Sequence, residues 1–307
     1  VLESRRTISS RELTEELSDP RARLIHHIHR DNSYEPNQIV NIGRRVIGIA
    51  MRTLMILKIG GSVLTDKRKK TPELREENLR LLGQSLKTLW PKPLIIVHGA
   101  GTYGHLLAKE YGLTNGYKDP RSLEGFIKTS SSMRLLNNRV VEVLNDAGLP
   151  CIGIPAGIVF RTRRGTIETI SLDPFLASLD IGIVPVTCGD VTFDSHLKFT
   201  VLSGDTIAVY FAKKLSAKTL VFATDVDGVY EFRNNERRLI RELKRGYHYK
   251  IQYRDVGDVT GGMAYKVETA YEAVEAGVDV RIVNGNYPDR VIEALLGNPT
   301  TGTKLTI

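Results

Sequence analysis

Short apolar runs alternate with amphipathic stretches along the chain from about residue 53 onward. The apolar runs predict strands because they are short and rich in valine and isoleucine. They are MILKI (55–59), LIIV (94–97), CIGIP (151–155), GIVPVTCG (182–189), TLVFAT (219–224) and VDVRIVN (278–284). Helices are predicted between and after them, at 71–89, 102–111, 122–147, 204–215, 262–276 and 288–296. This alternation predicts an α/β fold in which helices cover both faces of a mostly parallel central sheet.

Two stretches depart from the alternation and are expected to form β-hairpins. Residues 159–170 turn at RRG, and residues 191–202 turn at DSH. The glycine-containing and basic segment 60–70, GGSVLTDKRKK, is expected to be a loop.

Residues 1–52 differ from the rest and form a predicted N-terminal extension, which leaves 53–307 as one domain. Ser9 and Glu12 have the spacing of a capping box at the start of a helix, and the linker-like DNSYEPNQ follows it. Seven acidic residues argue against an organellar presequence, and no apolar core of a secretory signal is present. The extension is either a basic arm for a nucleic acid or partner, or a misassigned start. We favour the second, because residue 1 is Val and methionines stand at 51 and 55.

Composition excludes some classes of protein and leaves others open. The 307 residues are 41% hydrophobic and contain no apolar run of the length that a membrane span needs. The net charge of +8 could attract nucleic acid, a membrane surface or phosphorylated small molecules. No arginine-rich block with interleaved aromatics is present, which argues against a nucleic acid partner. Cys151 and Cys188 lack metal-ligand spacing, so a reducing, cytoplasmic location is expected.

Glycine or acidic residues follow several predicted strands, where open α/β sheets bind ligands. The five segments are KIGGS (58–62), HGAGTYGH (98–105), SGD (203–205), TDVDGVY (224–230) and DVTGGMAYK (258–266). Glycines let backbone N–H groups approach a phosphate, and a lysine beside them adds positive charge. Each segment taken alone also fits an ordinary turn or helix start. No P-loop sequence is present.

In this order and spacing, the five segments resemble the amino acid kinase superfamily and closely resemble its archaeal-type isopentenyl phosphate kinases. The resemblance covers Met55 to Ile307. It implies an open three-layer α/β/α sandwich, with an acceptor-binding lobe (53–190) and a nucleotide-binding lobe (191–307). It implies transfer of the γ-phosphoryl group of ATP to isopentenyl phosphate, giving isopentenyl diphosphate for isoprenoid (mevalonate-type) biosynthesis. ATP and Mg²⁺ are the expected cofactors, with Mg²⁺ bridged by ATP phosphates and no metal ligands from the protein. Besides the small-molecule substrate, the expected partner is a second copy of the chain in a homodimer.

The resemblance also implies roles for individual residues. The catalytic residues are Lys58, Lys67, His105, Asp205 and Lys266, with Asp205 orienting the lysines at 58 and 266. The acceptor would bind to Ala100, Gly101, Tyr103, Gly104, His105, Gly189 and Asp190. Its alkenyl tail would lie in an apolar slot on the long helix, at Phe126, Thr129 and Met133. The nucleotide would bind to Lys58, Gly60, Gly61, Ser62, Gly101, Ser203, Gly204, Asp205, Thr224, Asp225, Asp227, Gly228, Tyr230, Gly261, Gly262 and Lys266.

The chemistry agrees with this choice of acceptor. A phosphate monoester has a second pKa near about 6, so at neutral pH it is already a nucleophilic oxyanion and needs no general base. What it needs is neutralisation of charge as two anionic phosphates approach, which lysine and histidine can supply. The alternatives are a fosfomycin kinase, which shares the acceptor-binding histidine, and a glutamate 5-kinase. The chain stops at GTKLTI, without the C-terminal domain that glutamate kinases often carry.

A chain that begins at Met55 is expected to keep nearly the full activity of the 307-residue chain, because all five segments lie beyond that residue. The measurement is the rate of ATP-dependent phosphorylation of isopentenyl phosphate by both chains. A shortened chain that is folded but inactive would show that the extension takes part in the reaction.

Overall fold

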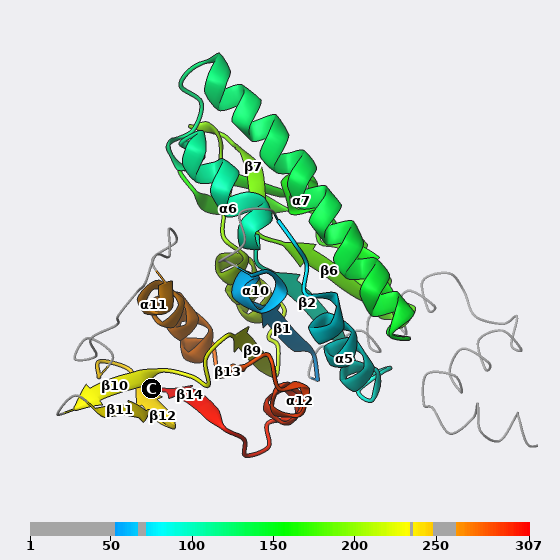
Figure 1. Cartoon of the computed structure of the whole chain (residues 1–307), viewed down its shortest axis with the longest axis vertical. Coiled ribbons are helices and arrows are strands. Elements are labelled where there is room, and N and C mark those ends of the chain that lie inside the picture. The colour runs from blue at the N-terminus through cyan, green and yellow to red at the C-terminus, as the bar shows by residue number, and fades with distance from the viewer. Residues whose placement is uncertain (1–52, 67–71, 234–235, 248–261) are drawn as a thin grey trace, which may run out of the picture. The chain divides into compact units, whose positions relative to one another are not determined.

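An eight-stranded sheet forms the centre of the computed structural model, which describes residues 53–66, 72–233, 236–247 and 262–307 (Figure 1). Its order is β12-β14-β13-β9-β1-β2-β6-β3. The strands are β1 (Met55–Ile59), β2 (Leu94–His98), β3 (Cys151–Gly153), β6 (Val184–Cys188), β9 (Thr219–Thr224), β12 (Glu242–Lys244), β13 (Asp279–Asn284) and β14 (Gly302–Thr306). All neighbouring pairs are parallel except β13 with β14, which confirms the mostly parallel sheet.

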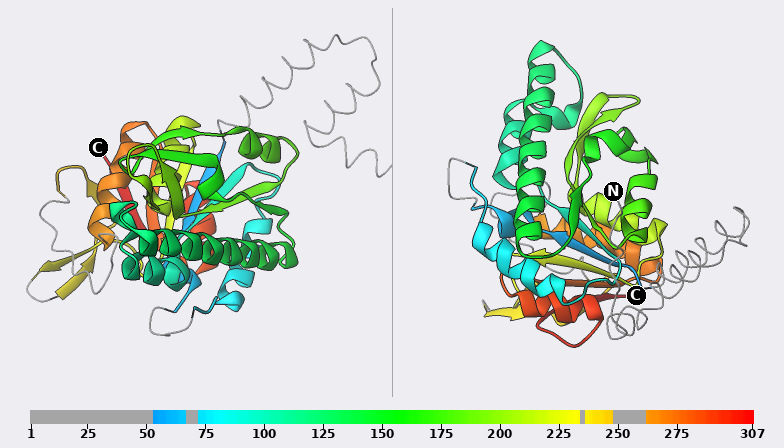
Figure 2. Two further views of the ribbon diagram at one scale, coloured as in Figure 1. Left: turned by 90° about the horizontal axis from the view of Figure 1, so that it is seen from above. Right: turned by 90° about the vertical axis from the view of Figure 1, so that its right-hand side faces the viewer.

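Helices cover both faces of this sheet (Figure 2). Alternate residues of β1 enter two separate cores, because successive side chains of a strand point to opposite faces. Ile56 packs with residues of α10 (Gly204–Lys214) and α11 (Gly262–Glu275). Leu57 packs with residues of α5 (Glu76–Lys87), α7 (Pro120–Asp146) and α12 (Pro288–Leu296). The predicted three-layer α/β/α sandwich is therefore confirmed.

Both predicted hairpins are present and join into a second, four-stranded sheet of order β5-β4-β7-β8. The first hairpin is β4 (Phe160–Arg163) with β5 (Thr166–Ile170), and the second is β7 (Asp190–Asp194) with β8 (Lys198–Leu202). Asp194 links the two turns, since its carboxylate accepts the N–H groups of Gly165, His196 and Leu197. These hydrogen bonds hold the pKa of Asp194 below its usual range.

The remaining elements refine the prediction. The long helix α7 is unbroken and begins at Pro120, because Asp119 and Ser122 form a capping box before it. Residues 61–64 of the expected loop are instead the short helix α4 (Gly61–Leu64), and α5 begins at Glu76. The elements without a sequence prediction are η1 (Leu113–Asn115), α8 (Ala156–Val159), α9 (Asp173–Asp180), β10 (Tyr230–Arg233), β11 (Glu236–Leu239), β12 and β14.

The structure bears only in part on three further expectations: the N-terminal capping box, the division into lobes and the lack of a membrane span. The capping box at Ser9 and Glu12 lies outside the described residues. The expected boundary between two lobes, at 190/191, falls at the start of β7, and the division into lobes stays a prediction. Within the described part of the chain, no helix has the length and apolar character needed to cross a membrane.

Candidate functional site

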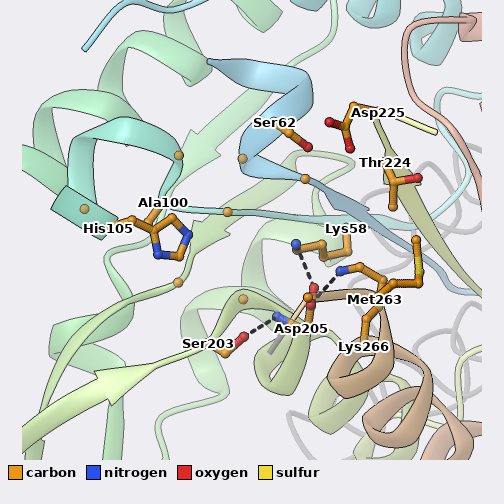
Figure 3. Close-up of a pocket in the computed structure, with 18 of the residues that line it drawn as sticks. Lys58, Ser62, Ala100, His105, Ser203, Asp205, Thr224, Asp225, Met263 and Lys266 are labelled. Carbon is orange, nitrogen blue, oxygen red and sulfur yellow. Dashed lines mark hydrogen bonds and ion pairs between the residues drawn. The ribbon is translucent and has the colours of Figure 1, made fainter. Parts of the chain in front are cut away.

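A cavity of about 500 Å³ lies where parallel strands of the central sheet end. It is lined by residues at or just beyond the carboxyl ends of β1, β2, β6 and β9, and by the first residues of α4, α6 (Gly101–Glu110), α10 and α11 (Figure 3). The N–H groups in the first turn of a helix have no partner within the helix and carry partial positive charge. The first turns of α6, α10 and α11 meet at this one cavity, so the cavity favours an anionic ligand.

The two glycine-rich loops after β1 and β2 touch each other beside the cavity. A Cβ atom on Gly61 would lie 2.5 Å from the backbone nitrogen of Gly101, closer than real Cβ contacts allow. Gly101 also has a φ of 51°, a left-handed conformation that favours glycine. The glycines of KIGGS and HGAGTYGH are therefore required for the two loops to pack together, whatever ligand they bind.

His98, the first histidine of HGAGTYGH, is fully buried behind these loops. Its Nδ1 lies 3.0 Å from the carbonyl oxygen of Gly99, and its Nε2 lies 3.0 Å from Oδ1 of Asn137 on α7. Burial lowers the pKa of His98, although the contacts to Gly99 and Asn137 oppose this shift. His98 therefore positions the loop against the long helix.

Asp205 lies between two buried lysines at the centre of the cavity wall (Figure 3). Its Oδ1 is 2.7 Å from Nζ of Lys58, and its Oδ2 is 2.6 Å from Nζ of Lys266. The three side chains are only 8–11% exposed. Ser203 caps α10 by accepting the N–H of Asp205 at 3.2 Å, which fixes the start of the helix that carries the carboxylate.

The charges of this triad do not balance. One carboxylate faces two ammonium groups, so the group carries a net positive charge when all three are ionised. The two lysines hold the pKa of Asp205 well below its usual range. Burial, together with repulsion from Lys58, lowers the pKa of Lys266 to about 8, although Asp205 opposes this shift. An anion that enters the cavity would offset the excess positive charge.

The other side of the cavity carries His105, from the second turn of α6 (Figure 3). The lining also includes Gly189 and Asp190, at the end of β6 and the start of β7. Asp190 is buried, and its Oδ1 accepts the N–H of Val191 at 2.7 Å. Burial raises the pKa of Asp190 to about 7, because desolvation outweighs the backbone hydrogen bonds to its carboxylate.

An apolar end adjoins this region. It is formed by Ala108, Thr129, Met133, Val191 and Val201. Thr129 is 2% exposed, and within the described part of the chain its hydroxyl oxygen has no hydrogen-bond partner. Thr129 and Met133 of the predicted slot therefore line the apolar end, and the slot as a site for the tail stays a prediction.

Most of the predicted site residues meet in this one cavity, and three described ones do not line it. Tyr103 is on α6, and its side chain packs against the core shared by α5 and α7. Phe126 is on α7, but its ring stacks on that of Phe199 at 4.7 Å, behind the apolar end of the cavity. Asp227 instead hydrogen-bonds to Tyr230, Asn284 and Arg290. The prediction that Tyr103, Phe126 and Asp227 contact ligand directly is not supported by their positions. Lys67 and Gly261 lie outside the described residues.

Eight lining residues were not among the predicted site residues. They are Gly99, Ala108, Val191, Val201, Leu202, Val226, Arg237 and Met263. Val191 and Val201 could have been found from the predicted hairpin, because its alternation places their side chains on one face. Arg237 could not, since its strand is a short polar one that no apolar run announces.

Comparison with known proteins agrees with this geometry. The amino acid kinase family matches residues 53–284 of the chain. The chain belongs to this family. It is 34% identical over 266 residues to an isopentenyl phosphate kinase of Methanothermobacter thermautotrophicus, which covers 82% of this chain and 99% of that relative. A solved isopentenyl phosphate kinase structure matches with a TM-score of 0.71 and 32% identity, over 82% of this chain and 100% of the other.

A more distant relative has another name. An acetylglutamate kinase of Halothermothrix orenii is 26% identical over 275 residues, which is 81% of this chain and 90% of that enzyme. The resemblance to isopentenyl phosphate kinases is thus confirmed, and the sequence identity to them is higher than to this acetylglutamate kinase.

Asp205→Asn keeps the shape of the side chain but removes the charge that the two lysines share. Loss of one member of a buried ion pair lowers the free energy of unfolding by about 3–5 kcal/mol. Asp205 also orients both ammonium groups. Since a hydrogen bond to a charged group contributes about 1.5–3 kcal/mol, we expect kcat/KM for ATP to fall at least about tenfold. Lys266 acts as a cation, so activity is present below its pKa and declines as the pH rises through it. In the variant this pKa is lower, and the alkaline decline should begin at a lower pH. The measurement is the pH profile of kcat/KM for ATP.

Glu272→Gln is the matched control for that profile. Glu272 accepts from Lys213 at 2.7 Å, and this exposed ion pair also joins α10 to α11. Loss of this ion pair is expected to leave unchanged the pH at which kcat/KM for ATP declines on the alkaline side. An Asp205→Asn profile with an unmoved alkaline limb would show that Lys266 does not set it.

Proposed function

We propose that the protein transfers the γ-phosphoryl group of ATP to the phosphate of isopentenyl phosphate, giving isopentenyl diphosphate and ADP. The observation that carries the proposal is one cavity with two kinds of anion site, the Lys58–Asp205–Lys266 triad on one side and His105 on the other. Three relatives with 32–34% identity to this chain are named isopentenyl phosphate kinases, which supports this choice of acceptor.

The triad suits the phosphoryl group in transit. Phosphoryl transfer needs positioning and stabilisation of negative charge more than covalent help from the protein. Lys58 and Lys266 are held by one carboxylate, so their ammonium groups are oriented before the substrates bind. Such preorganised charge stabilises a transition state without reorganisation during the reaction. Lys67 is proposed to contact the transferred group as well, by resemblance alone.

The acceptor end suits a small phosphate monoester with an apolar tail. His105 would donate to the acceptor phosphate, with the backbone of Ala100, Gly101, Gly104 and Gly189 around it and Asp190 beside it. The tail would lie against Thr129 and Met133, with Val191 and Val201 closing the end. In this proposal Phe126 supports the wall of the slot and does not contact the tail, because it packs behind that wall.

The nucleotide would occupy the rest of the cavity. Its lining there includes Gly60, Gly61, Ser62, Ser203, Gly204, Thr224, Asp225, Gly228, Tyr230 and Gly262. Within the described ranges no group of three histidine, cysteine or acidic residues could hold a metal ion, and both oxygens of Asp205 face lysines. A metal site built from protein ligands therefore does not fit these residues. In the proposal Mg²⁺ accompanies the ATP phosphates, and no step is derived through it.

The proposal includes a homodimer in the cytoplasm. Cys151 and Cys188 are free thiols, which agrees with a reducing compartment. Sedimentation of the purified chain tests the dimer, and cell fractionation tests the location.

Steady-state kinetics with isopentenyl phosphate, fosfomycin and glutamate as acceptors tests the proposed function. We expect kcat/KM for isopentenyl phosphate to exceed the other two by at least about 100-fold, because neither competitor combines a phosphate monoester with an apolar tail. A higher value for fosfomycin would replace isopentenyl phosphate as the acceptor.

His105→Ala is expected to impair use of the acceptor and to leave ATP binding close to normal. A hydrogen bond to a charged group contributes about 1.5–3 kcal/mol, so kcat/KM for isopentenyl phosphate should fall at least about tenfold. His105→Gln keeps a donor and should be less damaging. Acceptor kinetics at saturating ATP and calorimetry with the nucleotide measure the two effects. An equal loss of ATP affinity would identify the loop as a nucleotide site.

Thr129→Val is expected to stabilise the protein and to improve use of the apolar tail. Replacing a buried hydroxyl that has no partner by a methyl group of similar shape should raise the free energy of unfolding by about 1 kcal/mol. It should also lower KM for isopentenyl phosphate, because the slot becomes fully apolar. Chemical denaturation and acceptor kinetics are the measurements.

Thr187→Val is the control for this pair of effects. Thr187 is buried in β6 and does not line the cavity, and among the described residues its hydroxyl has no hydrogen-bond partner. It should stabilise the protein without changing KM. An unchanged KM in both variants would place the tail elsewhere.

A further inference from the structure

An arginine outside every sequence motif lies on the cavity wall, stacked on a tyrosine. Tyr230 begins β10, and Arg237 follows in β11, the strand that pairs with it. The Cζ atom of Arg237 is 3.6 Å from the centre of the Tyr230 ring. Both residues line the cavity, and Arg237 is exposed. A planar guanidinium held this close to a ring presents its own flat surface to the cavity.

The tyrosine under the arginine is held in place by a hydrogen-bond network. Its hydroxyl donates to Oδ2 of Asp227 at 3.1 Å. Oδ1 of Asp227 in turn accepts from Asn284 at 3.0 Å and from Arg290 at 2.7 Å. These hydrogen bonds lower the pKa of Asp227, so the carboxylate remains charged. The ring is thus anchored to β13 and α12, which fixes the surface on which Arg237 rests.

The lining around this pair differs from the phosphate-binding part of the cavity. Lys58 and Lys266 gather at Asp205 and supply the positive charge there. The loop that leads to Tyr230 adds Val226 and Gly228 to the lining, and the start of α11 adds Met263, so uncharged residues also line the cavity. Figure 1 draws the β10–β11 hairpin beside α11, away from α6, which carries His105. A nucleotide with its phosphates at the triad would extend its base away from the acceptor, toward such a surface.

We propose that the nucleotide base stacks on the guanidinium of Arg237, with Tyr230 as its rigid support, and that this pair makes the protein prefer purine nucleotides. The inference rests on the proposed kinase function. Guanidinium groups stack on aromatic faces, and the larger rings of purines offer more area for such contact than pyrimidines do.

Arg237→Gln tests the proposal, with calorimetry on adenosine, AMP, ADP and ATP. Stacking on a base contributes about 1–3 kcal/mol, so the dissociation constants should rise about 5- to 150-fold, by the same factor for all four ligands. The ratio of kcat/KM for ATP to that for CTP should fall, while KM for isopentenyl phosphate stays the same. A loss that grows with the number of phosphates would mean that Arg237 contacts phosphate, and it would overturn the proposal.

Arg238→Gln is the matched control. Arg238 is the next residue of β11, so its side chain points to the other face of the hairpin, where it lies 3.8 Å from Glu236. It should leave all four dissociation constants unchanged. Equal effects at both positions, or none at either, would make Arg237 an ordinary surface residue.

Tyr230→Phe tests whether the hydroxyl of Tyr230 helps to hold the ring under Arg237. It keeps the ring but loses the hydroxyl that donates to Asp227, so a smaller loss of adenosine affinity than in Arg237→Gln is expected. Loss of folding on this change would show up in denaturation, and Arg237→Gln would then carry the test alone. A wild type that binds adenosine through Arg237 but does not phosphorylate isopentenyl phosphate would refute the proposed function and leave this inference standing.

Discussion

The shared carboxylate of Asp205 is the interaction on which the site depends. It draws together Lys58 from the first strand of the sheet and Lys266 from α11, more than 200 residues later. Removing three charges from water is costly, and one carboxylate compensates only one of two ammonium groups. A cation–π contact with the ring of Phe222, whose centre lies 5.1 Å from the Nζ atom of Lys266, also stabilises the charge of this lysine. An anionic ligand would offset the remaining positive charge, so folding of this region and the proposed binding of a phosphate would rest on the same electrostatics.

This arrangement requires the loops around it to approach closely. Gly61 and Gly101 meet without room for a side chain, and Gly204 lies in the same way against Gly189, since a Cβ on Gly189 would be 2.7 Å from the Gly204 nitrogen. Buried His98 fixes the loop before α6 by contacts to the Gly99 carbonyl and to Asn137. The glycines therefore determine how near α4, α6 and α10 can come, and with them how many helix starts one ligand can meet.

The parts of this structure that follow from local sequence patterns could be predicted from the sequence alone. The buried strands are apolar runs, the hairpins turn at glycine or polar residues, and the phosphate-binding segments stand at strand ends, so these could be predicted. The packing of Phe126 could not be predicted, because helix spacing shows that it shares a face with Thr129 and Met133 but not that its ring stacks on that of Phe199. Asp227 has the sequence context of a ligand contact, yet its partners Asn284 and Arg290 come from distant elements. Arg237 reaches the cavity only through the pairing of two short polar strands. Such tertiary contacts leave no periodic trace in a single sequence.

Two buried carboxyl groups of the same cavity have opposite properties, and the contrast explains how one cavity can accept two anions. Asp205 faces two lysines, which hold its pKa well below the usual range, so it is charged at every physiological pH. Asp190 accepts backbone N–H groups and feels only the more distant charge of Arg134, so burial dominates and raises its pKa to about 7. Near neutral pH a substantial fraction of Asp190 is therefore protonated and uncharged. In the proposed reaction a carboxylate fixed in the charged state at this end of the cavity would repel an incoming phosphate dianion, whereas Asp190 would take up a proton as that dianion approaches. Negative charge is thus kept where lysines compensate it and is reduced where the acceptor phosphate would lie.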